Sequence, residues 1–104
     1  MIRLEAIIES IKCNKIRITD HADEEAYADE LSFDEILTSI SEGETIEQYP
    51  EDKPYPSCLI LSKNAKGEPI HTVWAYRSET RSSVLITVYR PDPQKWIDGK
   101  TRRN

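Results

Sequence analysis

The two histidines are the side chains of this chain best suited to acid–base chemistry near neutral pH, because an imidazole ordinarily titrates in that range. His21 stands at the expected start of a helix, and His71 lies within Pro69–Tyr76, an apolar run that predicts a strand. Each also has a structural interpretation, His21 as a partner of a nearby strand or helix cap and His71 as a half-buried sheet residue with a hydrogen-bond partner. The residue pattern leaves both interpretations open.

Cationic and aromatic side chains that could hold a nucleic acid are spread over the second half of the chain. Phosphate oxygens could be contacted by Lys53, Arg77, Arg81, Arg90 and Lys95. An Arg can bind two phosphate oxygens at once, and Arg90 is the best placed because it ends a predicted strand. The rings that could stack on unpaired bases, or instead fill the core, are Tyr49, Tyr55, Trp74, Tyr76, Tyr89 and Trp96.

The sequence lacks the residue patterns that mark several other kinds of functional site. Cys13 and Cys58 lie far apart and the two histidines are distant, so no zinc-ligand spacing exists. The three glycines form no phosphate-binding loop, and there is no Gly-x-Ser-x-Gly elbow. Carboxylates between Asp20 and Glu35 fit a solvated helix face better than a divalent-cation site. We therefore expect no metal and no cofactor.

The charges are strongly divided along the chain. The net charge is −5, yet Asp20 to Asp52 holds 13 acidic residues and no Lys or Arg, while the remainder holds 14 basic and 6 acidic ones, or +8. One region repels phosphate and the other could attract it. The acidic region either keeps the protein soluble or masks or recruits a basic partner.

Three helices are expected in the first half of the chain. Leu4, Ile7, Ile8 and Ile11 form an amphipathic stripe over residues 1–12. After an edge strand at residues 15–19, whose Lys and Arg discourage further pairing, a second helix begins with Asp20 as N-cap and ends near residue 29 or 30. A capping box, Ser32 to Glu35, starts a third helix, which a left-handed Gly43 should end.

The second half of the chain predicts a sheet. Residues 44–49 alternate as a strand, prolines at 50, 54 and 56 enforce an extended loop, and three further strands follow at 57–62, 69–76 and 83–89. Short turns at 64–67 and 77–82 make these strands antiparallel. The predicted fold class is α+β, with N-terminal helices on a mainly antiparallel sheet of four to five strands. Both sheet faces carry apolar groups, so the pattern does not say which face the helices cover.

The length of 104 residues predicts one α+β domain over residues 1–96, followed by a flexible basic tail at 97–104. The first dozen residues are interrupted by charges, so they match neither a signal peptide nor a membrane span. We expect a cytoplasmic protein with reduced cysteines and no membrane partner. A monomer and a homodimer are both compatible with this size.

Seven motifs, taken in order, resemble the bacterial family called domain of unknown function 4258. They are Ile18–Ala22 (ITDHA), Leu31–Ile36 (LSFDEI), Gly43–Glu47 (GETIE), Tyr49–Pro50, Lys53–Leu59 (KPYPSCL), Pro69–His71 (PIH) and Ile86–Asp92 (ITVYRPD). The resemblance covers about residues 16–96. That family is similar, more remotely, to the small toxins of the RelE, ParE and BrnT kind, in which helices pack on a compact sheet and active members cut RNA. Glu25 is a departure, since family members often have Arg four residues after the histidine.

The resemblance implies a metal-independent endoribonuclease or a degenerate relative that keeps the RelE-like architecture. The chemistry needs a base for the ribose 2′-hydroxyl, an acid for the leaving oxygen and a cation for the phosphorane. His71 and His21 would transfer the protons and Arg90 would stabilise the phosphate. Substrate would be positioned by Tyr49, Lys53, Tyr55 and Tyr89.

A noncatalytic interaction module is the alternative. Its sheet face or acidic helix would bind a partner protein, such as a cognate antitoxin, or a second copy of the chain. RNA is the partner that the catalytic hypothesis requires.

Overall fold

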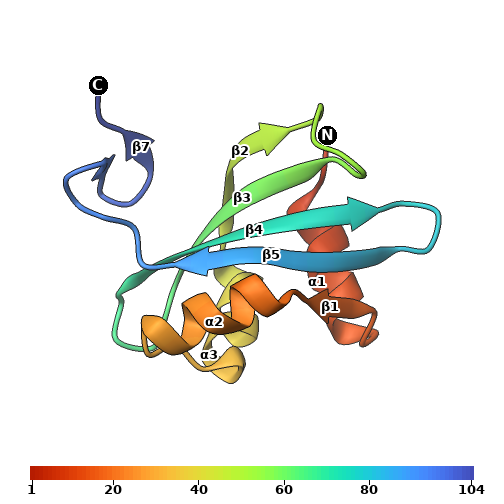
Figure 1. Cartoon of the computed structure of the whole chain (residues 1–104), viewed down its shortest axis with the longest axis horizontal. Helices are drawn as coiled ribbons and strands as arrows, with labels where there is room; N and C mark the ends of the chain where they lie inside the picture. The colour runs from red at the N-terminus through yellow and green to blue at the C-terminus, as the bar shows by residue number, and fades with distance from the viewer.

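The computed structural model describes all 104 residues, as helices packed on a five-stranded sheet with a small C-terminal hairpin (Figure 1). The helices are α1 (Leu4–Lys12), α2 (Asp20–Ala28), α3 (Phe33–Ser39) and the 3-10 helix η1 (Ile40–Glu42). The strands are β1 (Ile16–Ile18), β2 (Glu44–Tyr49), β3 (Ser57–Lys63), β4 (Pro69–Arg77), β5 (Ser82–Tyr89), β6 (Trp96–Ile97) and β7 (Thr101–Arg102). No helix combines the length and apolarity needed to cross a bilayer.

The large sheet has the order β1-β5-β4-β3-β2. β1 runs parallel to β5, and every other pair in the sheet is antiparallel. The predicted α+β class and mainly antiparallel sheet are therefore confirmed. The likeness to RelE-type toxins stays a prediction.

The start of α2 differs from the prediction, because Thr19 and not Asp20 is its N-cap. Thr19 has extended backbone angles, and its Oγ1 accepts a hydrogen bond from Ala22 N at 3.1 Å. The same hydroxyl donates to Ile86 O at 3.0 Å. Thr19 thus links the end of β1 to the beginning of α2, which places Asp20 inside the first turn.

Gly43 also differs from the prediction, since its φ of −81° is extended and not left-handed. The helix α3 ends through η1, so no left-handed C-terminal residue is required. Glycine is needed here for space: a Cβ would lie 2.9 Å from Ile60 Cγ2 and 3.1 Å from Ile40 O. The capping box at Ser32 and Glu35 is confirmed. In the β3–β4 turn Gly67 has a φ of 79°, which favours glycine.

The two faces of the sheet have different covers. Side chains alternate along a strand, so Ile70 and Trp74 of β4 face the helices and join the buried core with Ile7 and Ile36. In Figure 1 the helices lie behind and below the sheet, while the opposite face is turned toward the viewer. We call this opposite face the open face. It carries His71, Val73 and Ala75 of β4.

The C-terminal segment covers one end of the open face. β6 and β7 pair with each other, and Trp96 at the start of this hairpin is only 4% exposed. Residues 97–104, which the sequence predicts as a flexible basic tail, include Ile97 of β6 and all of β7. The other end of the open face, near the β4–β5 turn, has no such cover.

Two elements in succession form hydrogen bonds with the backbone of β5 along the edge that faces away from β4. β1 pairs only with the first part of β5, Ser83 to Leu85. Further along, Glu25 Oε1 accepts from Val88 N at 3.2 Å and Asp29 Oδ2 accepts from Arg90 N at 3.0 Å. Four helical residues rise about 6 Å and two strand residues about 6.7 Å, so the two carboxylates of α2 match two consecutive outward N–H groups. This contact gives Glu25 a structural role at the edge of β5.

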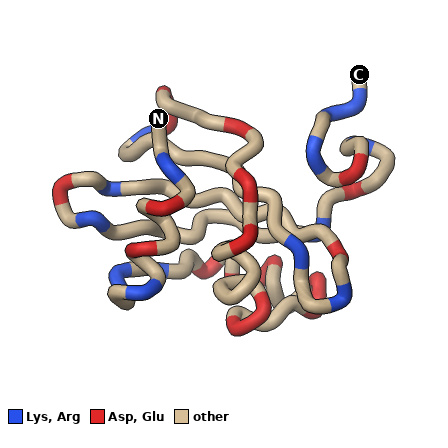
Figure 2. Tube along the Cα trace, turned by 180° about the vertical axis from the view of Figure 1, so that it is seen from behind, with Lys and Arg blue, Asp and Glu red and all other residues tan.

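The acidic and basic residues, which are separated along the chain, are also separated in space. The acidic residues of α2 and α3 lie together along one side of the molecule, shown red in Figure 2. Lys and Arg of the α1–β1 connection and of the β4–β5 turn meet at one end of the molecule. The basic end therefore includes the uncovered part of the open face.

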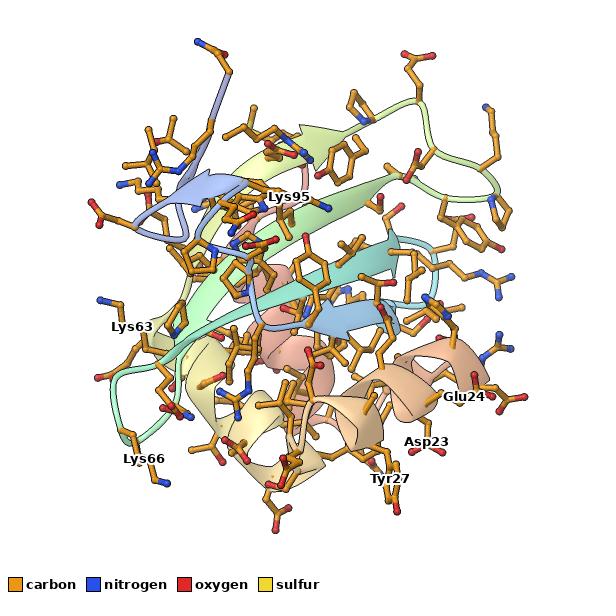
Figure 3. All side chains as sticks on the ribbon, turned by 60° about the vertical axis from the view of Figure 1, so that its left-hand side comes forward. Asp23, Glu24, Tyr27, Lys63, Lys66 and Lys95 are labelled. Atoms are coloured by element: carbon orange, nitrogen blue, oxygen red, sulfur yellow. The ribbon has the colours of Figure 1, made fainter.

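The carboxylate of Glu25 should contribute measurably to stability. In Glu25→Ala the N–H of Val88 loses its acceptor at a half-buried edge, so we expect the free energy of unfolding in urea to fall by about 1–2 kcal/mol. Glu24→Ala is the matched control, because Glu24 points outward on α2 (Figure 3) and should change stability by less than about 0.5 kcal/mol. Equal losses in both variants would contradict the role of Glu25.

Candidate functional site

His71 lies on the open face of β4 and is fully buried. Its Nε2 is 2.5 Å from Gly99 O and its Nδ1 is 3.1 Å from the Tyr89 hydroxyl. A carbonyl oxygen can only accept, so Nε2 carries the hydrogen and Nδ1 of the neutral ring accepts from Tyr89. Both ring nitrogens are therefore already engaged.

The C-terminal hairpin closes over this histidine through a chain of contacts. The Trp96 ring meets His71 edge-on, with centroids 4.5 Å apart, and Arg102 lies 4.6 Å above Trp96. Arg102 also binds both carboxylate oxygens of Glu47 on β2, at 2.8 and 3.1 Å. Together with Tyr89 and Tyr49 these residues form what we call the covered cluster.

Burial sets the proton positions in the covered cluster. It lowers the pKa of His71, against the opposing hydrogen bond to Gly99, so the ring is neutral at pH 7. Burial raises the pKa of Tyr89, and burial together with the hydrogen bond to Glu47 raises that of Tyr49 to about 12. The hydrogen bonds from Arg102 hold the pKa of Glu47 below its usual range. These proton states stabilise a closed hydrogen-bonded layer.

The other predicted catalytic residues lie elsewhere. His21 is exposed on α2, with Nε2 3.2 Å from Glu25 Oε1. Arg90 donates from Nε to Asp29 O at 3.1 Å and from Nη1 to Glu68 at 3.4 Å. The structure thus brings His71, Tyr89 and Tyr49 together, and leaves His21 and Arg90 in separate contacts.

A groove occupies the uncovered end of the open face, with a volume of about 570 Å³. Ala75, Val84 and Ile86 form its floor, from β4 and β5. Around them stand the side chains Lys15, Arg17, Tyr55 and Arg77. We call this the cationic groove, because three Lys or Arg residues and no Asp or Glu line it.

The cations of this groove have no carboxylate partners. The ion pairs of the Arg side chains elsewhere involve Arg3, Arg90 and Arg102, whereas Lys15, Arg17 and Arg77 form none. Arg77 instead lies 5.2 Å from the centre of the Tyr55 ring. Unpaired cations around an apolar floor favour an anionic ligand that also has an apolar or aromatic part.

Only some of the residues that line this groove are predicted contacts in the sequence. Tyr55 and Arg77 were among the predicted contacts, and Lys53 is exposed beside Pro54, which lines the groove. Lys15 and Arg17 were interpreted only as protection of an edge strand. The alternation of the sequence places both side chains on one face of the strand. Only the parallel pairing with β5 shows which residues lie beside that face.

The structure contains no assembled metal site and no disulfide bond. No group of three or more His, Cys, Asp or Glu side chains is arranged to hold a metal ion. Cys13 is exposed and Cys58 is buried, and both are free thiols. Burial raises the pKa of Cys58 to about 11, which disfavours its reactive thiolate.

Comparison with known proteins found one family. The family model described as "Domain of unknown function (DUF4258)" matches residues 18–90. No curated protein and no solved structure matches the chain. The matched segment runs from the end of β1 to Arg90, so it includes His21, His71 and Tyr89 but not the C-terminal hairpin.

The buried neutral His71 should make stability depend on pH. Its pKa is lowered in the folded state, so the unfolded chain binds a proton first as pH falls below about 6.5, and the free energy of unfolding decreases. We expect urea denaturation to show this loss in the wild type and in His21→Gln between about pH 7.5 and 5.5. The His71→Phe variant should be less stable at neutral pH, but its free energy of unfolding should fall by less when the pH is lowered. Parallel losses in all three proteins would contradict a neutral His71.

Proposed function

The chain belongs to the DUF4258 family of domains of unknown function, and from that premise we propose that it is a noncatalytic binding module whose cationic groove holds an anionic ligand. The observation that supports this is the gathering of Lys15, Arg17 and Arg77, without carboxylate partners, around an apolar floor. Like charges held near one another repel, and an anion in the groove would relieve that repulsion. The fold creates this concentration of cations, because it brings Lys15 and Arg17 from the start of the chain beside Arg77 at the end of β4.

The endoribonuclease hypothesis has less support from the geometry. Both nitrogens of His71 are hydrogen-bonded beneath the hairpin, and His21 and Arg90 are engaged by carboxylates or carbonyls outside the covered cluster. A homodimer and a cognate antitoxin remain partner proposals, for which the open face offers a surface.

Anion binding is tested directly with inorganic polyphosphate. The affinity of the purified protein for polyphosphate is measured by competition against a labelled polyanion. We expect this affinity to fall as the salt concentration rises. Reversing two cations in Arg17→Glu/Arg77→Glu should weaken it about tenfold or more and reduce the salt slope by roughly one per cation. All three cations are exposed, so the thermal unfolding temperature should change little.

The matched control reverses two lysines at the other end of the sheet. Lys63 and Lys66 lie on the β3–β4 hairpin, away from the β4–β5 turn (Figures 1 and 3). Lys63→Glu/Lys66→Glu makes the same change in net charge, and we expect it to retain affinity within about twofold to threefold. Equal weakening by both double variants would mean that only net charge matters and would refute the cationic groove as the binding site.

The catalytic hypothesis has its own test. With chelator present and at low salt, we expect a defined single-stranded RNA to remain intact after incubation with the wild-type protein, because His71 is covered. Cleavage by the wild type that disappears in a folded His71→Gln variant would overturn this expectation and assign proton transfer to His71. Cleavage that persists in His71→Gln and His21→Gln would point to a contaminating nuclease.

A further inference from the structure

We infer that the occupant of the cationic groove is a single-stranded nucleic acid, with one unpaired base against Tyr55 and the apolar floor and with its phosphates on the cationic rim. This inference rests on the proposed function, because it names the ligand of the same groove. Three features of the groove support it.

The first feature is a pair of planar groups at the wall of the groove. The guanidinium carbon of Arg77 lies 5.2 Å from the centre of the Tyr55 ring. Tyr55 is half-buried between Pro54 and Pro56, whose fixed φ angles limit the movement of the loop. An aromatic ring and a guanidinium plane both stack well on a nucleobase, and a restrained ring loses little entropy when it does so.

The second feature is the spacing of two cations at β1, one immediately before the strand and one within it. Lys15 and Arg17 are two residues apart and both line the groove, so their backbone positions are about 6.6 Å apart in an extended strand. This spacing is close to that between neighbouring phosphates of an extended nucleic-acid strand. Each cation can therefore contact a separate phosphate while the base turns toward the floor.

The third feature is the apolar floor. Ala75 is small and lies opposite Val84 across the β4–β5 pair, and Ile86 of β5 adds a second aliphatic side chain. A base placed there would cover apolar surface with its flat face, which requires that this face be unpaired and unstacked. A duplex could reach the rim cations but could not insert a base.

An acidic protein segment is the competing occupant. Its carboxylates would neutralise Lys15, Arg17 and Arg77, but an acidic side chain has no aromatic ring to stack on the Tyr55–Arg77 pair. The nucleic acid uses both the charges and the planar groups, and for this reason we favour it.

The experiment compares four labelled probes of matched charge by fluorescence anisotropy: a short oligouridylate, an RNA duplex with the same total number of phosphates, polyphosphate and polyglutamate. We expect the oligouridylate to bind most tightly. Tyr55→Leu keeps apolar volume but removes the ring, and should weaken oligouridylate binding by about fivefold or more while leaving polyphosphate binding unchanged. Tyr55→Phe should retain wild-type affinity, and Arg77→Lys should show an intermediate loss because it keeps charge without the plane.

Two outcomes would overturn the inference and leave the proposed function standing. One is duplex or polyglutamate binding as tight as that of oligouridylate, and the other is an oligouridylate affinity that Tyr55→Leu does not change in a folded protein. Failure of the proposed function is distinct, since none of the four polyanions would then bind in a way that Arg17→Glu/Arg77→Glu weakens.

Discussion

The hydrogen-bonding edge of β5 sets the position of most other parts of the molecule. A three-residue strand can pair with only part of an eight-residue one, so β1 satisfies β5 as far as Leu85 and the carboxylates of α2 take over at Val88 and Arg90. Unpaired N–H groups at a half-buried edge are costly, which makes this division a strong constraint. It fixes α2 along the sheet, holds Arg90 against Asp29 and brings β1 beside the first half of β5.

The second constraint is that β3 and β4 are apolar on both faces. The helices can cover only one of them, so Leu59, Leu61 and His71 on the other face also need a cover. The C-terminal hairpin provides it at one end through Trp96, and the bidentate contact of Arg102 with Glu47 attaches the hairpin to β2. The opposite end of this face has no hairpin, and the groove lies there.

These two covers separate the chemistry of the open face into two parts. Under the hairpin, low exposure favours neutral groups, so the His71 ring stays neutral and the two tyrosines keep their hydroxyl protons. In the groove the cations remain hydrated and unpaired, which favours binding of a charged ligand. The same sheet therefore offers a rigid buried layer and an accessible cationic surface, and only the second can meet a large ligand without rearrangement.

The sequence alone determined the elements whose signals are local. The i, i+3, i+4, i+7 stripe of α1, the capping box of Ser32 and Glu35, and the alternation of β2 each predicted their element because the relevant contacts lie within a few residues. The α+β class followed from their order. Tertiary structure decided the rest: Gly43 must be a glycine because Ile60 approaches it, His71 is closed off because Gly99 and Trp96 reach it from the C-terminal hairpin, and Lys15 joins Arg77 because β1 pairs in parallel with β5. Such contacts depend on which chain segments meet across the sheet, and no local pattern contains that information.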